Sequence, residues 1–258
     1  MKNHKWFAAL AVIVMVLAVA GCSDGSSGNE FISGSSGGSG NSSGTGNSGV
    51  DYSKCAVGDF VLKDGTILSK DETPESGTVA AVIVRAAADG KPALGVGIVH
   101  NTMAWCTSSA AGYSTNITAL QGDTTTNYTD GSDGWEKLKA ACSDVASISG
   151  NYPAWNYSLT YAKTNGLTGN LATGWYLPTL AELYTIYQNK TAVDASLSKA
   201  GGSQFGTGSY LSCCQDPSGG YYARVLSFNT GNMISNYKYG KYGASGHYDY
   251  VCSVRAFN

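Results

Sequence analysis

Beyond position 50, apolar residues first occur in short runs separated by glycine-rich polar segments. Residues 59–62, 79–84 and 93–99 carry such runs, and their length and β-branched content predict strands. The segment Lys63-Asp64-Gly65-Thr66 follows the first run and contains the Asp-Gly pair that closes β-hairpins. The pattern therefore predicts a strand-rich start of the domain, with a hairpin first.

The apolar spacing changes to a helical period in the middle of the chain. Over residues 135–145, apolar positions recur at steps of three, four and three, which predicts one face of a helix. A second helix is expected over residues 153–165, because proline stands at its first position and glycine just past its end. Thr179 and Glu182 have the spacing of a capping box, which predicts a helix over residues 180–189.

Short apolar segments of strand length return after residue 201. They cover residues 210–212, 222–228 and 250–257, and polar, glycine-rich loops separate them. Strands, then two or three helices, then strands again is the order of an α+β fold with a mixed, mostly antiparallel sheet. We expect the last strand to lie inside that sheet.

The first 21 residues have the pattern of a secretory signal peptide, with a basic start and the apolar run Trp6–Ala20. That run is shorter than the ~20 residues that a membrane-spanning helix needs. The segment Leu17-Ala18-Val19-Ala20-Gly21-Cys22 resembles the bacterial lipobox, whose cysteine receives a diacylglycerol before cleavage. We therefore expect lipidation of Cys22 and an exported chain anchored in the outer membrane and exposed at the surface. The alternative is a plain cleaved signal peptide with an incidental cysteine.

Residues 22–50 have the composition of a flexible tether. The 28 residues after Cys22 contain 9 Gly, 10 Ser and 3 Asn, so they cannot bury enough apolar surface to offset the entropy of ordering. The remaining residues, 51–258, are enough for one large domain. The expected organisation is a signal peptide (1–21), a lipidated tether (22–50) and one domain (51–258).

The mature chain carries a small negative charge. Removal of the signal peptide takes away Lys2 and Lys5 and no acidic residue, which leaves 14 basic and 18 acidic side chains and a net charge of −4 with histidine neutral. This balance argues against nucleic acid as a partner. Contact with the membrane is expected through the lipid anchor.

Six cysteines remain besides Cys22, and outside the cytosol they are free to form disulfides. Their spacing is irregular, so the sequence leaves every pairing open, and it contains no paired Cys-x-x-Cys ligands of a zinc site. We expect all six to be structural or incidental. They are Cys55, Cys106, Cys142, Cys213, Cys214 and Cys252.

Three segments of the C-terminal third carry motifs in a fixed order. They are Gly174–Leu183, with the sequence GWYLPTLAEL; Tyr222–Gly231, with YARVLSFNTG; and Val251–Phe257, with VCSVRAF. Together they resemble the W-R-L-P-T-x-x-E-L, A-W-x-V-x-F-x-x-G and V-R-P-V-R-A-F segments of bacterial domains related to formylglycine-generating enzyme. The resemblance covers about 85 residues and implies a C-type-lectin-like fold of that branch. Leu211 and Arg224 depart from it, because the family has Trp there.

Tyrosine is concentrated in the same region, where the last 50 residues hold eight of the seventeen tyrosines. Residues 237–250 combine Tyr with Gly, Ser, His and Asp, which is the composition of antibody binding loops. The alternative is a turn-rich loop whose tyrosines serve packing.

The lipobox, the fold motifs and the tyrosine-rich segment together resemble the treponemal variable proteins, lipoproteins that a diversity-generating retroelement rewrites at asparagine codons. The resemblance implies a variable region of about residues 210–252 that binds ligands at the cell surface. Rewritten codons cannot yield Glu, Gln, Lys, Met or Trp, and from Ser209 onward only four residues belong to that set: Gln215, Met233, Lys238 and Lys241. The candidate ligand-binding residues are Cys213, Cys214, Tyr221, Tyr222, Arg224, Tyr237, Tyr239, Tyr242, His247, Tyr248, Asp249 and Tyr250, with Cys252 as a further variable position.

Catalysis and calcium-dependent sugar binding have weaker support. The adjacent pair Cys213-Cys214 does not match the cysteine spacing of the formylglycine-generating oxidases, and neither His100 nor His247 lies in a catalytic motif. The triplet Gln215-Asp216-Pro217 lacks the residues that accompany lectin calcium sites. We therefore expect a protein without enzymatic activity, cofactor or metal, whose ligand is an unknown protein or glycan on other cells. A fixed-specificity adhesin or glycan-binding lipoprotein on the same scaffold is the alternative.

Overall fold

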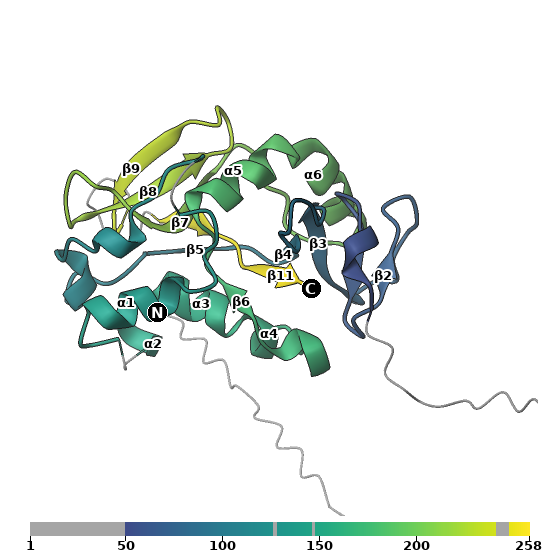
Figure 1. The fold of residues 1–258 in the computed structure, drawn as a ribbon, viewed down its shortest axis with the longest axis horizontal. Coiled ribbons are helices and arrows are strands. Elements are labelled where there is room, and N and C mark those ends of the chain that lie inside the picture. Colours follow the sequence, from purple (N-terminus) through teal and green to yellow (C-terminus); the bar gives the residue numbers. More distant parts are fainter. Residues whose placement is uncertain (1–49, 126–127, 146–147, 241–247) are drawn as a thin grey trace, which may run out of the picture. The chain divides into compact units, whose positions relative to one another are not determined.

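Two β-sheets form the framework of the domain (Figure 1). The computed structural model describes residues 50–125, 128–145, 148–240 and 248–258. The six-stranded sheet has the order β2-β1-β3-β4-β11-β6, and the five-stranded sheet has the order β5-β10-β7-β8-β9.

All neighbours in the six-stranded sheet are antiparallel. The C-terminal strand lies between β4 and β6, which confirms that it is inside a sheet. The expectation of one strand over residues 250–257 in a single sheet was wrong, because the first part of that segment pairs in the five-stranded sheet. The β1–β2 hairpin closes where the Asp-Gly turn was predicted. The strands are β1 (Phe60–Leu62), β2 (Ile67–Leu68), β3 (Val79–Arg85), β4 (Ala93–Gly97), β6 (Trp175–Tyr176) and β11 (Val254–Phe257).

The five-stranded sheet is antiparallel except where β10 runs parallel to β7. The α+β class with mostly antiparallel pairing is therefore confirmed. Only Cys252 and Ser253 separate β10 from β11, so the chain crosses from one sheet to the other in two residues. The strands are β5 (Asn101–Met103), β7 (Ser209–Gln215), β8 (Tyr222–Ser227), β9 (Met233–Tyr237) and β10 (Asp249–Val251).

The prediction of two or three helices was wrong, because the described residues form six α-helical segments. The expected helix over residues 153–165 is interrupted at Thr160, and a further helix follows Asn189. That helix presents only Val193 and Leu197 as large apolar residues among small and polar ones, too weak a stripe to predict. The segments are α1 (Gly134–Ala141), α2 (Ile148–Asn151), α3 (Pro153–Leu159), α4 (Tyr161–Thr164), α5 (Leu180–Gln188) and α6 (Lys190–Lys199).

Helix α5 begins with the predicted capping box. Thr179 Oγ1 accepts a hydrogen bond from the Glu182 amide at 3.1 Å, and the Glu182 carboxylate accepts one from the Thr179 amide at 2.8 Å. The buried carboxylate also accepts hydrogen bonds from the Tyr176 hydroxyl and the Gly131 amide. Burial raises the pKa of Glu182. This one side chain therefore joins the start of α5 to β6 and to the loop before α1.

The helix α5 also connects the two sheets, because it contacts β3 of one and both β7 and β8 of the other. The described residues, from Val50 to Asn258, belong to one compact unit. The six cysteines of this unit are buried and have free thiols, so none of them forms a disulfide with another. Among the described residues, no helix combines the length and apolar content that crossing a bilayer requires.

Candidate binding face

The described part of the chain exposes large hydrophobic side chains mainly on the five-stranded sheet and its connections. Five of the six such side chains fall between residues 221 and 250, and they are 38% to 47% exposed. A concentration of exposed apolar surface marks an interaction site on a folded protein. The five are Tyr221, Met233, Ile234, Tyr248 and Tyr250; the sixth is Val99.

The pairing of β8 with β9 places predicted site residues side by side. Tyr222 lies opposite Tyr237 and Arg224 opposite Ser235, so all four point to the same side of the sheet. The two tyrosine rings are 4.7 Å apart between centroids, and the Tyr222 hydroxyl donates a hydrogen bond to the Tyr237 hydroxyl at 3.2 Å. The alternate residues Ala223 and Val225 are buried on the other side.

A buried carboxylate fixes Arg224 on this face. Arg224 Nη1 lies 3.0 Å from Asp216 Oδ2 and 3.0 Å from Ser235 Oγ, and Ser235 also donates a hydrogen bond to Asp216. The amide and hydroxyl of Ser218 donate to the other carboxylate oxygen. Burial acts to raise the pKa of Asp216, but these hydrogen bonds and the guanidinium charge outweigh it and hold the pKa below its usual value. Asp216 is therefore ionised, both of its carboxylate oxygens accept hydrogen bonds, and it holds Arg224 in place.

A second aromatic group forms around Tyr113, which belongs to the short 3₁₀ helix Ala111–Tyr113. Its ring meets the edge of Tyr221 at 5.1 Å and the edge of Tyr239 at 5.4 Å. The sequence interpretation did not include Tyr113, since it lies 124 residues before the start of the tyrosine-rich segment at Tyr237 and in no motif. Only tertiary contact shows that it belongs to the face.

Two buried polar residues hold the loop that carries Tyr113. Lys238 Nζ donates to the carbonyls of Gly112 at 2.6 Å and Thr115 at 3.3 Å, and to Gln215 Oε1 at 3.2 Å. The same Gln215 oxygen accepts a hydrogen bond from the Ile117 amide at 2.9 Å. Burial lowers the pKa of Lys238 to about 8.

A groove of about 350 Å³ lies beside these tyrosines. Tyr239 and Tyr248 line one part of it, and residues from outside the C-terminal segment complete it: Thr102, Met103, Ala104, Thr107, Ser108 and Pro153. Apolar walls with a few hydroxyl groups are suited to an apolar side chain or a small apolar group of a ligand.

The predicted site residues fall into three groups. Tyr221, Tyr248 and Tyr250 are exposed, and Tyr222, Arg224, Tyr237 and Tyr239 are partly buried on or beside the same face. Cys213, Cys214, Asp249 and Cys252 are buried and are not part of the exposed face. Cys22, Tyr242 and His247 lie outside the described residues.

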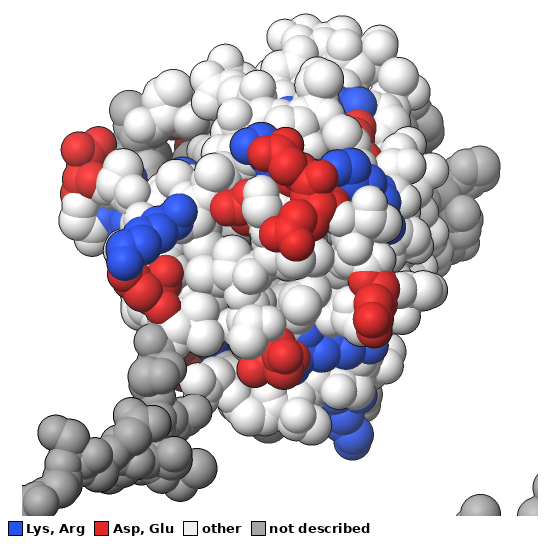
Figure 2. Space-filling view, turned by 90° about the vertical axis from the view of Figure 1, so that its right-hand side faces the viewer, with Lys and Arg blue, Asp and Glu red and all other residues white. Residues whose placement is uncertain are grey.

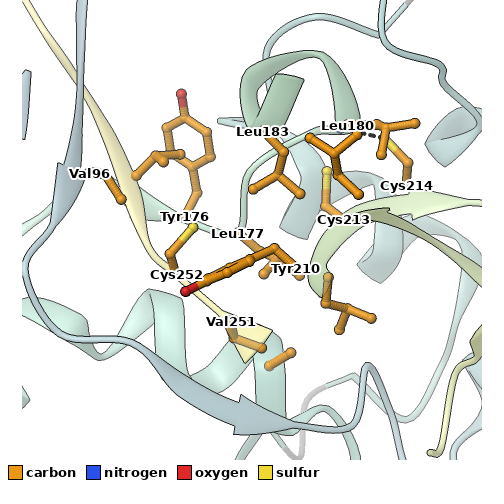
Figure 3. Packing of buried hydrophobic residues seen from close by; sticks show 14 of the residues in the cluster. Val96, Tyr176, Leu177, Leu180, Leu183, Tyr210, Cys213, Cys214, Val251 and Cys252 are labelled. Carbon is orange, nitrogen blue, oxygen red and sulfur yellow. Dashed lines mark hydrogen bonds between the residues drawn. The ribbon is translucent and has the colours of Figure 1, made fainter. Parts of the chain in front are cut away.

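The two adjacent cysteines are buried because β7 is the middle strand of its sheet and both faces are covered at this point. Cys213 lies beside Leu180 and Leu183 of α5 (Figure 3). Cys214 Sγ accepts a hydrogen bond from the Leu180 amide at 3.3 Å. Burial and the contact with Cys214 raise the pKa of the Cys213 thiol well above its usual value. Asp249 is also occupied inside the fold, where its carboxylate accepts a hydrogen bond from Asn236 Nδ2 at 2.8 Å.

The side chains that could bind a metal ion or act in catalysis are dispersed over the domain. The described ranges contain no group of three or more His, Cys, Asp or Glu side chains placed to hold a metal ion. Burial lowers the pKa of His100 to about 3, and its Nδ1 pairs with the Tyr210 hydroxyl at 2.9 Å.

On the side of the domain at the right of Figure 1, acidic and basic residues are intermingled (Figure 2).

Comparison with known proteins gives a likeness in structure. No protein-family model and no curated protein matches the sequence. A fimbrial protein from Bacteroides ovatus, known from a crystal structure, is similar to this chain with a TM-score of 0.59 and 12% sequence identity. The match covers 79% of this chain and 49% of that chain, so this chain spans about half the length of the fimbrial protein. At this identity the likeness concerns the fold.

Proposed function

We propose that this protein is a lipoprotein displayed at the cell surface that binds ligands through the face formed by the five-stranded sheet and Tyr113. The observation that carries the proposal is the gathering of exposed aromatic and apolar side chains on that sheet. Tyrosine supplies large, rigid contact area at a low entropy cost, which suits a surface that recognises other molecules. The anchor is the lipidated Cys22, and the fold is that of C-type lectins in the branch related to formylglycine-generating enzyme.

The face and its support are made by different side chains, which favours a face that varies between copies of the gene. Gln215 and Lys238 are buried and hold the Tyr113 loop, whereas Tyr221, Tyr248 and Tyr250 are exposed. Gln and Lys cannot arise from rewritten asparagine codons, so a retroelement would leave the two supporting residues constant. Changes confined to the exposed tyrosines would leave the core intact.

The kind of ligand follows from the chemistry of the face. The groove beside Tyr239 and Tyr248 accepts an apolar group, and the surrounding tyrosines and Arg224 offer hydrogen bonds, which together favour a protein ligand over a glycan. The similar Bacteroides ovatus structure is named a fimbrial protein, and a place outside the cell fits the same interpretation. Catalysis has no part in the proposal, because both thiols of the adjacent pair, Cys213 and Cys214, are buried in the core and are not accessible from the face.

The test is to sequence many copies of the gene, and its sibling genes, from one population of the source organism. Differences are expected between Tyr210 and Cys252, at the exposed positions above all. Six positions are expected to stay constant: Gln215, Lys238, Lys241, Val254, Arg255 and Phe257. Residues 51–209 serve as the internal control. An even spread of substitutions over residues 51–258 would instead support the fixed-specificity adhesin.

A further inference from the structure

Strand β9 is the last strand of its sheet, and no strand of the described residues pairs with one row of its backbone groups. The Lys238 amide donates to the Tyr221 carbonyl and the Ser227 amide to the Asn232 carbonyl, both at 2.9 Å. These two bonds flank β9 and show that its even-numbered residues hydrogen-bond to β8. The N–H and C=O groups of Met233, Ser235 and Tyr237 therefore point away from the sheet.

This edge lacks the features that normally protect edge strands. The sequence of β9, Met-Ile-Ser-Asn-Tyr, contains no charged residue and no proline, and its pairing with β8 contains no bulge. Met233 and Ile234 project to opposite faces and are 40% and 38% exposed. Ile234 lies on the same side of the sheet as buried Val225, but it is exposed at the sheet edge. An unprotected apolar edge is a template for another strand.

We propose that β9 pairs antiparallel with β9 of a second copy of this chain, around a two-fold axis at Ser235. In this register Ser235 faces its own counterpart, and Met233 faces Tyr237 of the second copy. In this register each outward-pointing N–H of one copy meets a C=O of the other, so the row of backbone groups is complementary to itself. Three facing pairs give about six backbone hydrogen bonds. The pairing brings together no uncompensated charge, because Arg224 beside the strand is neutralised by Asp216.

The pairing has a consequence for binding that rests on the proposed function. A two-fold axis through an antiparallel strand pair is perpendicular to the sheet, so the same face of both copies looks the same way. The Tyr222–Tyr237 surfaces of the two copies then adjoin across the new strand pair. A ligand with repeated sites would engage both surfaces and gain avidity.

The interface is small, so the test uses the full-length chain on the membrane. A pair of five-residue strands covers less than the ~800 Å² per partner of a standard interface, and such contacts form best at high local concentration. Cells displaying the Ser235→Cys variant are treated with a short bismaleimide cross-linker, and the anchored protein is then examined for covalent dimers. Glu72→Cys, an exposed position in the loop between β2 and β3 of the other sheet, is the control. The six native domain cysteines are buried and are not expected to react.

We expect several-fold more dimer from Ser235→Cys than from Glu72→Cys. Adding Met233→Lys to Ser235→Cys places a charge on the edge and should reduce the dimer several-fold, while the matched change Val99→Lys at a similarly exposed residue should leave it unchanged. If Ser235→Cys is not displayed, co-expressed Met233→Cys and Tyr237→Cys chains with different tags test the same register.

Three results would overturn the pairing: equal dimer from the two cysteine variants, no effect of Met233→Lys, or cross-linking of Ser235→Cys to a different protein. The readout needs no ligand, so it is separate from the test of the proposed function. Dimers together with evenly spread sequence differences would uphold the pairing and reject the variable binding face.

Discussion

Replacement of Lys238 by methionine would test whether the binding face depends on a buried polar support. Lys238 donates to the carbonyls of Gly112 and Thr115 and to Gln215, and its ammonium lies 4.6 Å from the Trp105 ring centroid. Methionine has a similar length and no charge, so it fills much of the space and donates nothing. The variant therefore removes the hydrogen bonds while disturbing the packing little.

The change in folding free energy depends on two opposing contributions, the hydrogen bonds of the ammonium and the cost of burying its charge. Three hydrogen bonds from a charged donor contribute roughly 5 kcal/mol at the low end of their usual range. Burying the ammonium costs roughly 3 kcal/mol, judged from the fall of the Lys238 pKa from 10.5 to about 8, and the methionine variant recovers that cost. The net loss of folding free energy should be about 2 kcal/mol. Ligand binding should fall as well, because the loop that carries Tyr113 loses its attachment.

Urea unfolding of the Lys238→Met protein measures the loss of folding free energy. Hydrogen exchange at the Gly112 and Ile117 amides measures how firmly the loop that carries Tyr113 is held. These amides donate to the Tyr152 hydroxyl and to Gln215 Oε1, and they should exchange faster in the variant. The matched control is Lys139→Met, which removes an exposed pair with Glu136 and should change stability by less than about 0.5 kcal/mol. Equal stability of the two variants, or unchanged exchange at both amides, would refute the supporting role of Lys238.

Three further predictions address pH, the exposed tyrosines and the anchor. The folded chain releases the Lys238 proton near pH 8 and the unfolded chain near pH 10.5, so the unfolded state binds more protons between these two values. The stability of the wild type relative to Lys238→Met, measured by urea titration, should therefore rise with pH across that window. Tyr221→Ala and Tyr248→Ala should each change the free energy of unfolding by about 0.5 kcal/mol and weaken ligand binding. Trp175→Ala, which leaves a cavity in the core, should lower the free energy of unfolding by about 3–5 kcal/mol. Similar melting temperatures for all three variants would contradict the division between face and core. Cys22→Ser should abolish incorporation of labelled palmitate and partition into detergent, and continued labelling would reject the lipobox assignment.

The elements that the sequence predicted well are those with local signals. The capping box of Thr179 and Glu182 needs only residues three apart, and the structure contains both of its hydrogen bonds. The strands over residues 79–84 and 93–99 were recognisable from continuous apolar runs, which correspond to β3 and β4. Weak local patterns gave errors. The small and polar residues of α6 showed no helical stripe, and β9 carries too mixed a sequence to stand out.

Local sequence also predicted where tyrosines gather, but it could not predict which candidate residues face solvent. Cys213 and Cys214 belong to the tyrosine-rich third of the chain, yet they are buried because β7 became the middle strand of its sheet. The position of a strand within a sheet depends on pairing between distant segments, and no short stretch of sequence encodes it.

The α+β class, the start of α5 and the region that holds the exposed tyrosines could be predicted from the amino-acid sequence, since each depends on patterns within a few residues. The residues that complete and support the face depend on tertiary contacts. Lys238 reaches the Gly112 carbonyl across 126 positions, and Tyr113 contacts Tyr221 and Tyr239 from a loop that Lys238 and Gln215 hold against the sheet. A lysine in a polar segment has the same local signature whether it ends in water or in the core. Its role follows from burial, which the whole fold determines.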